Sequence, residues 1–233
     1  MQNIDILPLQ SLVIRSNALP HCVDIMMSIC PPATSENKTR KGLEYLNIPS
    51  LCSDQSRSLL DECAGSLREL YVSDCKMYPF PVIQPADSFS KLVHIRRIHL
   101  HCKVLMPLWA KVFTGLLATL PSPSPLTHLG MSLIPHSATK SPTEEISEIS
   151  WHTLDDLLGS SRFPSLQEFN LSIRGISEEE FMWRAKEGRW LTKCFEQGIV
   201  RYGEVDDFDD MMHRSGFSWY PDRLVQSRTR WYP

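Results

Sequence analysis

The sequence is short of glycine and has no surplus of basic residues. Its 233 residues include 10 glycines, none of which lies in a Gly-rich pattern of the kind that cradles phosphate. Lys and Arg number 24 while Asp and Glu number 27, which gives a net charge of -3. Binding to nucleic acids or to anionic membranes needs a clustered surplus of Lys and Arg, so we expect neither partner.

The motifs of common enzymes are also missing. The sequence contains no GxSxG, HExxH, P-loop or GxGxxG pattern, and Asp155 and Asp156 lack the alternating spacing of a calcium loop. We therefore expect a protein that is not an enzyme, with no catalytic residues, no metal and no cofactor.

Segments that direct a chain out of the cytoplasm are missing as well. Residues 1–10 have no basic region followed by an apolar one, so no secretory signal is expected. Residues 104–120, the longest apolar segment, include Pro107 and Lys111 and fall short of the roughly 20 residues that span a bilayer, which predicts a buried helix. The 7 cysteines form no CxxC pair, which favours reduced thiols in the cytoplasm or in the nucleus.

Leucine is abundant, with 28 residues, and follows a recurring pattern of apolar-x-x-apolar-x-apolar. Leu occupies the first two positions in four of the matches, where chance predicts roughly one. Successive matches begin 34, 24, 28, 31 and 40 residues apart. The matches are Leu9, Leu12 and Ile14; Leu43, Leu46 and Ile48; Leu67, Leu70 and Val72; Ile95, Ile98 and Leu100; Leu126, Leu129 and Met131; and Leu166, Phe169 and Leu171.

The segments between these matches have the signals of helices. Residues 53–64 and 151–158 place apolar side chains on one face, and Ser177 with Glu180 forms a capping box for a helix that ends at Gly198. Residues 199–203 predict a seventh strand. Strands and helices that alternate at these intervals predict an α/β fold: a leucine-rich-repeat-like solenoid with a curved parallel sheet, helices on its convex side and irregular repeats.

This pattern also sets the expected domains. Residues 1–205 form a solenoid of about seven irregular repeats. Residues 206–233 are an acidic and then Arg-rich and aromatic tail, which is either a cap or disordered. No amphipathic segment precedes the first strand, so we expect the isolated chain to be truncated at this end and to self-associate through an exposed sheet edge.

Four segments together resemble fungal F-box and leucine-rich-repeat-like proteins: PLTHLGMSL at 125–133, WHTLDDLL at 151–158, FPSLQEFNLSI at 163–173 and CFEQGIVRYGEV at 194–205. The resemblance is clearest in the C-terminal half. It implies the substrate-recognition region of a ubiquitin-ligase receptor, in which an F-box docks on a Skp-type adaptor. No F-box precedes Leu9, and the nearest match, residues 19–30, lies between two expected strands. Adaptor binding is therefore expected if an F-box lies upstream.

The positions between the apolar residues of each match are expected to face the concave side of the sheet, because side chains alternate along a strand. Tyr and Arg dominate many interfaces, so we predict a binding patch centred on Tyr45, Tyr71, Arg97 and His99. The alternative is a solvated polar face. The predicted binding face comprises Arg15, Tyr45, Asn47, Glu69, Tyr71, Arg97, His99, His101, His128, Glu168 and Asn170, and the other concave positions are Ser11, Val13, Ser73, Gly130, Ser132 and Ser172.

Two further groups of residues invite a ligand hypothesis. His99 and His101 share one face of a strand and only His128 could join them, so exposed histidines are a better interpretation than a zinc site. Trp183 and Trp190 lie seven residues apart on the expected last helix, and we interpret them as packing residues or as part of a C-terminal cap.

The leading functional hypothesis is a non-catalytic protein–protein interaction module with a protein substrate on its concave face. It fits the recognition region of an F-box-type ubiquitin-ligase receptor. One alternative is a freestanding repeat scaffold or truncated gene product without adaptor binding. A more remote one is a metal-dependent or Ser/Cys hydrolase.

Overall fold

The computed structural model describes residues 11–13, 42–48, 51, 54–76, 86–104, 109–135, 149, 151–188 and 190–203. Seven strands in this part of the chain form one sheet. The strands are β1 (Ser11–Val13), β2 (Tyr45–Ile48), β3 (Glu69–Lys76), β4 (Arg97–Val104), β5 (His128–Pro135), β6 (Glu168–Ile173) and β7 (Val200–Tyr202).

All strands of the sheet are parallel, and their order in space is their order along the chain. Five of the six apolar matches, and Leu12 of the first, therefore lie side by side, with Leu46 opposite Leu70, which is in turn opposite Ile98. The seventh strand, predicted at residues 199–203, pairs Val200 with Phe169. The α/β fold expected from the sequence is confirmed.

One backbone contact recurs at the start of successive strands. The carbonyl oxygen of Glu44 accepts hydrogen bonds from the backbone N–H groups of Arg68 and Glu69, and that of Arg68 accepts from Arg96 and Arg97. Two further carbonyl groups, of residues 96 and 127, accept from two successive N–H groups of the next unit in the same way. Equivalent residues therefore stack at a regular spacing of about 4.8 Å from strand to strand.

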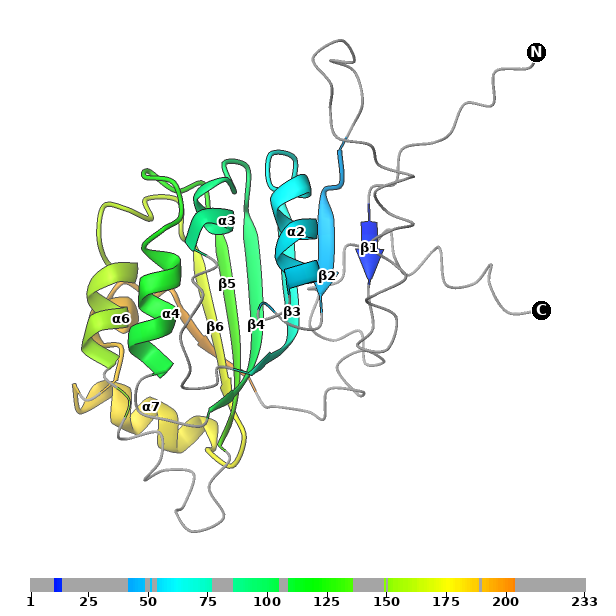
Figure 1. Cartoon of the computed structure of the whole chain (residues 1–233). Helices are drawn as coiled ribbons and strands as arrows, with labels where there is room; N and C mark the ends of the chain where they lie inside the picture. Colours follow the sequence, from blue (N-terminus) through cyan, green and yellow to red (C-terminus); the bar gives the residue numbers. More distant parts are fainter. Residues whose placement is uncertain are drawn as a thin grey trace, which may run out of the picture.

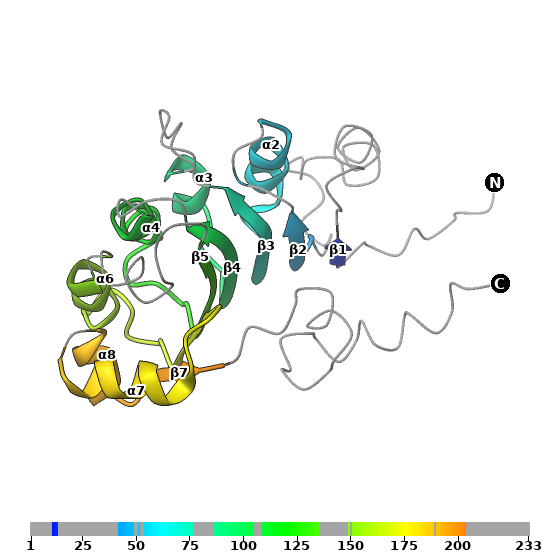
Figure 2. The same cartoon turned by 90° about the horizontal axis from the view of Figure 1, so that it is seen from below.

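The helices follow the strands and lie along the outer side of the bent sheet, as Figure 2 shows for α2, α3, α4 and α6. Figure 1 shows the same helices packed against one face of the sheet. The helices are α2 (Asp54–Cys63), α3 (Ala86–Ser90), α4 (Trp109–Leu117), α6 (Trp151–Leu158), α7 (Glu178–Lys186) and α8 (Thr192–Glu196).

The core lies between these helices and the sheet. Strand residues such as Leu70 and Leu129 pack against helix residues such as Phe89, Phe113 and Leu154, all of them at most 2% exposed. Burial of each of these side chains stabilises the fold by roughly 1.5–3 kcal/mol relative to an exposed position. None of the described helices is long and apolar enough to cross a membrane.

Two of the expected helices differ from the observed ones. The helix expected at residues 104–120 begins at Trp109, because β4 continues to Val104 and pairs with β5 over its whole length. The helix expected from Ser177 to Gly198 is two helices, since Gly188 and Leu191 adopt left-handed backbone with φ of 69° and 49°. The expected capping box does form, with the Ser177 hydroxyl accepting from the backbone N–H of Glu180.

Candidate functional site

The face of the sheet opposite the helices carries polar side chains in aligned rows. The first polar row contains one residue from each of five neighbouring strands, which pair directly in register. It consists of Tyr45, Glu69, Arg97, His128 and Glu168. All five belong to the predicted binding face, so the register brings together residues that are far apart in the sequence.

Charged groups of the first polar row are partly exposed and interact with their neighbours. The Arg97 guanidinium lies 3.7 Å from the Glu69 carboxylate, with the two side chains 36% and 24% exposed. Burial raises the pKa of Glu69, while Arg97 acts in the opposite direction. Burial and the charge of Arg97 lower the pKa of His128, and the charge of Glu168 opposes this shift. The row therefore presents acidic and basic groups side by side.

The second polar row lies two residues further along the same strands. It consists of Asn47, Tyr71, His99, Gly130 and Asn170, which also pair in register. The rings of Tyr71 and His99 are stacked, with centroids 4.8 Å apart and planes 2° from parallel. Burial lowers the pKa of His99 to about 3, with a smaller contribution from His101. His99 is therefore neutral at physiological pH.

Gly130 determines how the His99 ring lies. A β-carbon at residue 130 would come within 2.2 Å of His99 Nδ1, closer than any real contact allows. The ring thus occupies the space that a side chain on β5 would fill. No sequence pattern singled out Gly130 for this role, although its place in a row of larger polar residues is the signal that could have done so.

Two serines continue the buried polar network from His99. The Ser132 hydroxyl lies 3.3 Å from His99 Nε2, and the Ser172 hydroxyl donates to Ser132 at 3.0 Å. Ser132 is 0% exposed. A nucleophile must be reachable by a substrate, so this Ser–His contact favours a structural network over the serine hydrolase alternative.

The expected exposure of the histidines is wrong. His99 and His101 are 7% and 6% exposed, and Asn47 and Asn170 are also buried. The His99 ring lies over Gly130 and is covered by neighbouring side chains. The alternation of side chains along one strand predicts the face on which a residue lies, but not how far its neighbours cover it. The accessible part of the predicted face is therefore smaller than expected. It consists of the partly exposed side chains of Glu69, Tyr71, Arg97, His128 and Glu168.

The zinc alternative has no cluster to support it in the described residues. No group of three or more His, Cys, Asp or Glu side chains that could hold a metal ion occurs among them. His99 Nε2 faces the Ser132 hydroxyl, and His128 Nδ1 lies 2.8 Å from the Thr127 hydroxyl.

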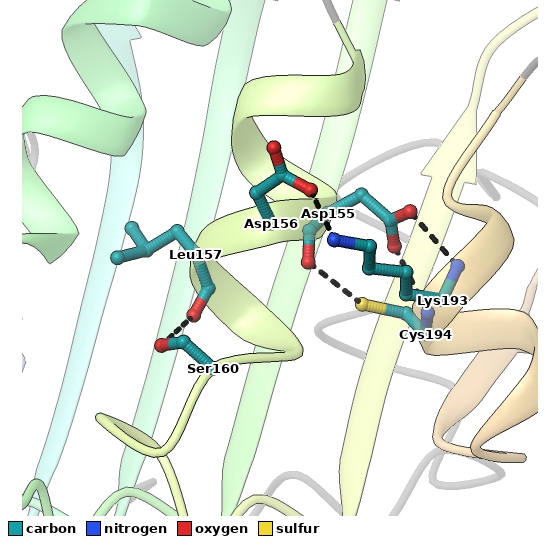
Figure 3. A network of polar contacts seen from close by, with 6 residues as sticks. All are labelled: Asp155, Asp156, Leu157, Ser160, Lys193 and Cys194. Carbon is teal, nitrogen blue, oxygen red and sulfur yellow. Dashed lines mark hydrogen bonds and ion pairs between the residues drawn. The ribbon is translucent and has the colours of Figure 1, made fainter.

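A second polar cluster, which the sequence did not point to, lies between α6 and α8 (Figure 3). The buried Asp155 carboxylate accepts hydrogen bonds from the backbone N–H groups of Lys193 and Cys194, at 2.8 and 2.9 Å. Leu191 at the N-cap of α8 provides no side-chain cap. Asp155 therefore caps α8 from another helix, which is a structural role.

The two tryptophans singled out in the sequence, Trp183 on α7 and Trp190 between α7 and α8, lie in different environments. Trp190 is 3% exposed and packs against Trp151 and Phe181, whereas Trp183 is 50% exposed. The Arg184 guanidinium lies 5.5 Å from the Trp183 ring and 5.1 Å from the Trp190 ring. The prediction that both lie on one helix is wrong, because Trp190 follows the break at Gly188.

Part of the predicted site lies outside the described residues. Arg15, the segment at 19–30 and the tail at 206–233 are in this group. Only the backbone is described for Ser11, Val13 and Ser73.

Comparison with known proteins gives no relative for this chain: no protein-family model, curated protein or solved structure matches it. The basis for a functional proposal is therefore the geometry of the polar sheet face. That geometry contains accessible charged and aromatic side chains on neighbouring strands, with buried polar residues beside them on the same face.

Proposed function

We propose that this chain is a non-catalytic protein-binding module built as a leucine-rich-repeat-like solenoid. Parallel strands in chain order, helices along the outer side of the sheet and a carbonyl that accepts two N–H groups at each strand start all support this architecture. Units of this kind bury their apolar stripe against their neighbours and leave the opposite sheet face for ligands.

The main support for the proposal is that the residues of the first polar row lie next to one another on neighbouring strands, with Tyr71 close by on β3. Glu69, Arg97 and His128 lie on adjacent strands and stay partly exposed. Five strands at about 4.8 Å spacing extend roughly 19 Å, a width suited to the centre of a protein interface. The partner is a folded or extended protein segment, with Tyr71 and Arg97 as its main contacts.

The resemblance to fungal F-box and leucine-rich-repeat-like proteins supports a more specific role. In this role the chain is the substrate-recognition region of a ubiquitin-ligase receptor in the cytoplasm or nucleus. Its direct test is binding of a purified Skp-type adaptor to the full chain and to a version extended by any F-box encoded upstream. Binding by neither leaves the freestanding repeat scaffold as the better interpretation.

The experiment that tests the binding face compares the proteins retained by three forms of the chain. The forms are the wild type, Tyr71→Ala with Arg97→Ala, and Lys186→Ala with Glu187→Ala, two exposed positions at the end of α7. We expect quantitative mass spectrometry to show partners lost from the first double variant and kept by the second. Identical partners for all three forms would contradict the proposed face. Thermal unfolding of each form checks that the fold is intact.

A further inference from the structure

Two arginines occupy equivalent positions at the start of β3 and β4. The Arg68 carbonyl accepts the backbone N–H groups of Arg96 and Arg97, at 2.7 and 3.0 Å. The Arg96 carbonyl accepts in the same way from the first residues of the next unit. The backbones of Arg68 and Arg96 are thus held directly before adjacent strands at a spacing of about 4.8 Å, and we call these two arginines the basic edge.

The charges of the basic edge are not paired within the described part of the chain. Arg68 and Arg96 are exposed, and neither has an ion-pair partner within the described part of the chain. Arg97 pairs with Glu69 and joins the edge to the first polar row. The backbones at Arg68 and Arg96 are about 4.8 Å apart, so an anionic ligand that pairs with both guanidinium groups gains two charge-assisted contacts.

Residues that precede Arg68 and Arg96 in the chain, and Glu44 before the neighbouring strand, indicate the class of ligand. Val93, in the turn between α3 and β4, is 48% exposed and can contact an apolar side chain of a partner. On α2, Asp61 is paired with Lys91, and Glu62 is exposed. Glu44 lies beside Arg68 on the other flank. A ligand that is anionic at its centre and neutral or basic at its ends complements this arrangement.

We propose that the basic edge binds a carboxylate-rich segment of a protein partner, with one carboxylate on Arg68 and another on Arg96. This rests on the proposed function, since it names the chemistry of a partner that reaches the first polar row through Arg97. Arginine presents a planar fork of donors that matches the two oxygens of a carboxylate. Binding to a nucleic acid needs a clustered surplus of Lys and Arg, and the sequence has 24 Lys and Arg against 27 Asp and Glu, so a short acidic protein segment is the better match for two arginines.

The test is binding of a fluorescein-labelled deca-glutamate peptide to the full chain, followed by anisotropy at low ionic strength. We expect Arg68→Glu with Arg96→Glu to weaken binding by about tenfold or more, because two charge-assisted contacts become repulsive. Binding by the wild type should weaken as salt is added. Absence of binding by the wild type would overturn the proposal.

The matched control is Lys186→Glu with Arg174→Glu, which makes the same change in net charge at exposed positions on α7 and after β6. An equal loss in both double variants would show a general charge effect and overturn the edge as a site. Tighter binding of inorganic polyphosphate, with the same dependence on Arg68 and Arg96, would overturn the assignment to carboxylates.

The two proposals fail in different ways. Partners lost on Tyr71→Ala with Arg97→Ala, together with unchanged deca-glutamate binding by the edge variant, would remove only the basic edge. Peptide binding that depends on Arg68 and Arg96, with no partner dependent on Tyr71 and Arg97, would remove only the proposed face.

Discussion

The His99 ring lies directly over Gly130 on the neighbouring strand, so that a β-carbon at residue 130 would be 2.2 Å from His99 Nδ1. The ring cannot swing aside freely, because it is stacked on Tyr71 and contacts the Ser132 hydroxyl. The centre of the polar face is therefore a packed layer in which one glycine makes room for one ring.

Gly130→Ala is expected to destabilise the protein by about 1–3 kcal/mol, the usual cost of forcing extra volume into a packed site. The measurement is the free energy of unfolding from chemical denaturation. Gly115→Ala is the control, since nothing lies within 4 Å of a β-carbon there and α4 should gain from the change. In the double variant with His99→Ala, the cost of the alanine at residue 130 should fall. An unchanged cost would contradict the contact.

The stability of the protein should decrease as the pH falls below about 6.5. His99 is buried and its pKa is about 3 in the folded state, below the value of 6.5 for an unperturbed histidine. Between these two pH values the unfolded state binds a proton that the folded state does not. The contribution of His99 to the free energy of unfolding is therefore complete above pH 6.5 and decreases as the pH falls towards 3. The expected slope is up to about 1.4 kcal/mol per pH unit.

Denaturation of His99→Phe over the same pH range measures this contribution. Phenylalanine keeps a ring for stacking on Tyr71 but cannot be protonated, so the stability of this variant should depend less on pH. His152→Gln, at an exposed position on α6, is the matched control and should behave as the wild type does. If the free energies of unfolding of His99→Phe and the wild type changed with pH in the same way, His99 would not be the source of the pH dependence.

The strands could be predicted from the sequence because each strand unit repeats its own apolar signal. Leu46, Leu70 and Leu129 occupy the second apolar position of three matches, and they lie in one stripe of the core. The break between α7 and α8 could not be predicted in the same way. Gly188, directly after the C-cap of α7, has the left-handed backbone that commonly ends a helix, and this glycine is the signal that the apolar spacing obscured. The left-handed conformation of Leu191 has no such signal in the sequence.

The sequence predicted which face of the sheet carries the candidate site residues, but not how exposed their side chains are. Strand alternation correctly assigns Arg97 and His99 to the face opposite the core, since both pair in register with the other polar residues. How much of each side chain is accessible depends on neighbours from other strands, such as Gly130 under His99. These contacts are set by register, and a pattern within one strand carries no information on them.

Asp155→Ala is expected to destabilise the protein by about 1–3 kcal/mol, because the N–H groups of Lys193 and Cys194 lose their acceptor. Chemical denaturation and hydrogen exchange at these two amides measure the effect. Asp156→Ala is the control: this exposed carboxylate pairs with Lys193 at 2.6 Å, and its removal should change stability little. Equal effects of the two substitutions would contradict the capping role of Asp155.

Cys194 should be unreactive in the native protein and should become reactive when α8 loosens. The thiol is 0% exposed, and burial followed by its contacts with Asp155 raises its pKa above that of a free cysteine. Since the thiolate is the reactive form, alkylation should be slower by about 100-fold or more than at an exposed thiol. Asp155→Ala removes the cap of α8 and should increase the rate through local opening.

The rate is measured by quenched iodoacetamide labelling and mass spectrometry of the peptide that contains Cys194. Ser58→Cys, at an exposed position on α2, supplies the reference thiol in the same chain. Labelling of Cys194 as fast as at residue 58 would show that the α6–α8 contact is open in solution. A slow rate that Asp155→Ala leaves unchanged would mean that burial alone protects the thiol, because the cap then contributes nothing to closure of α8 against α6.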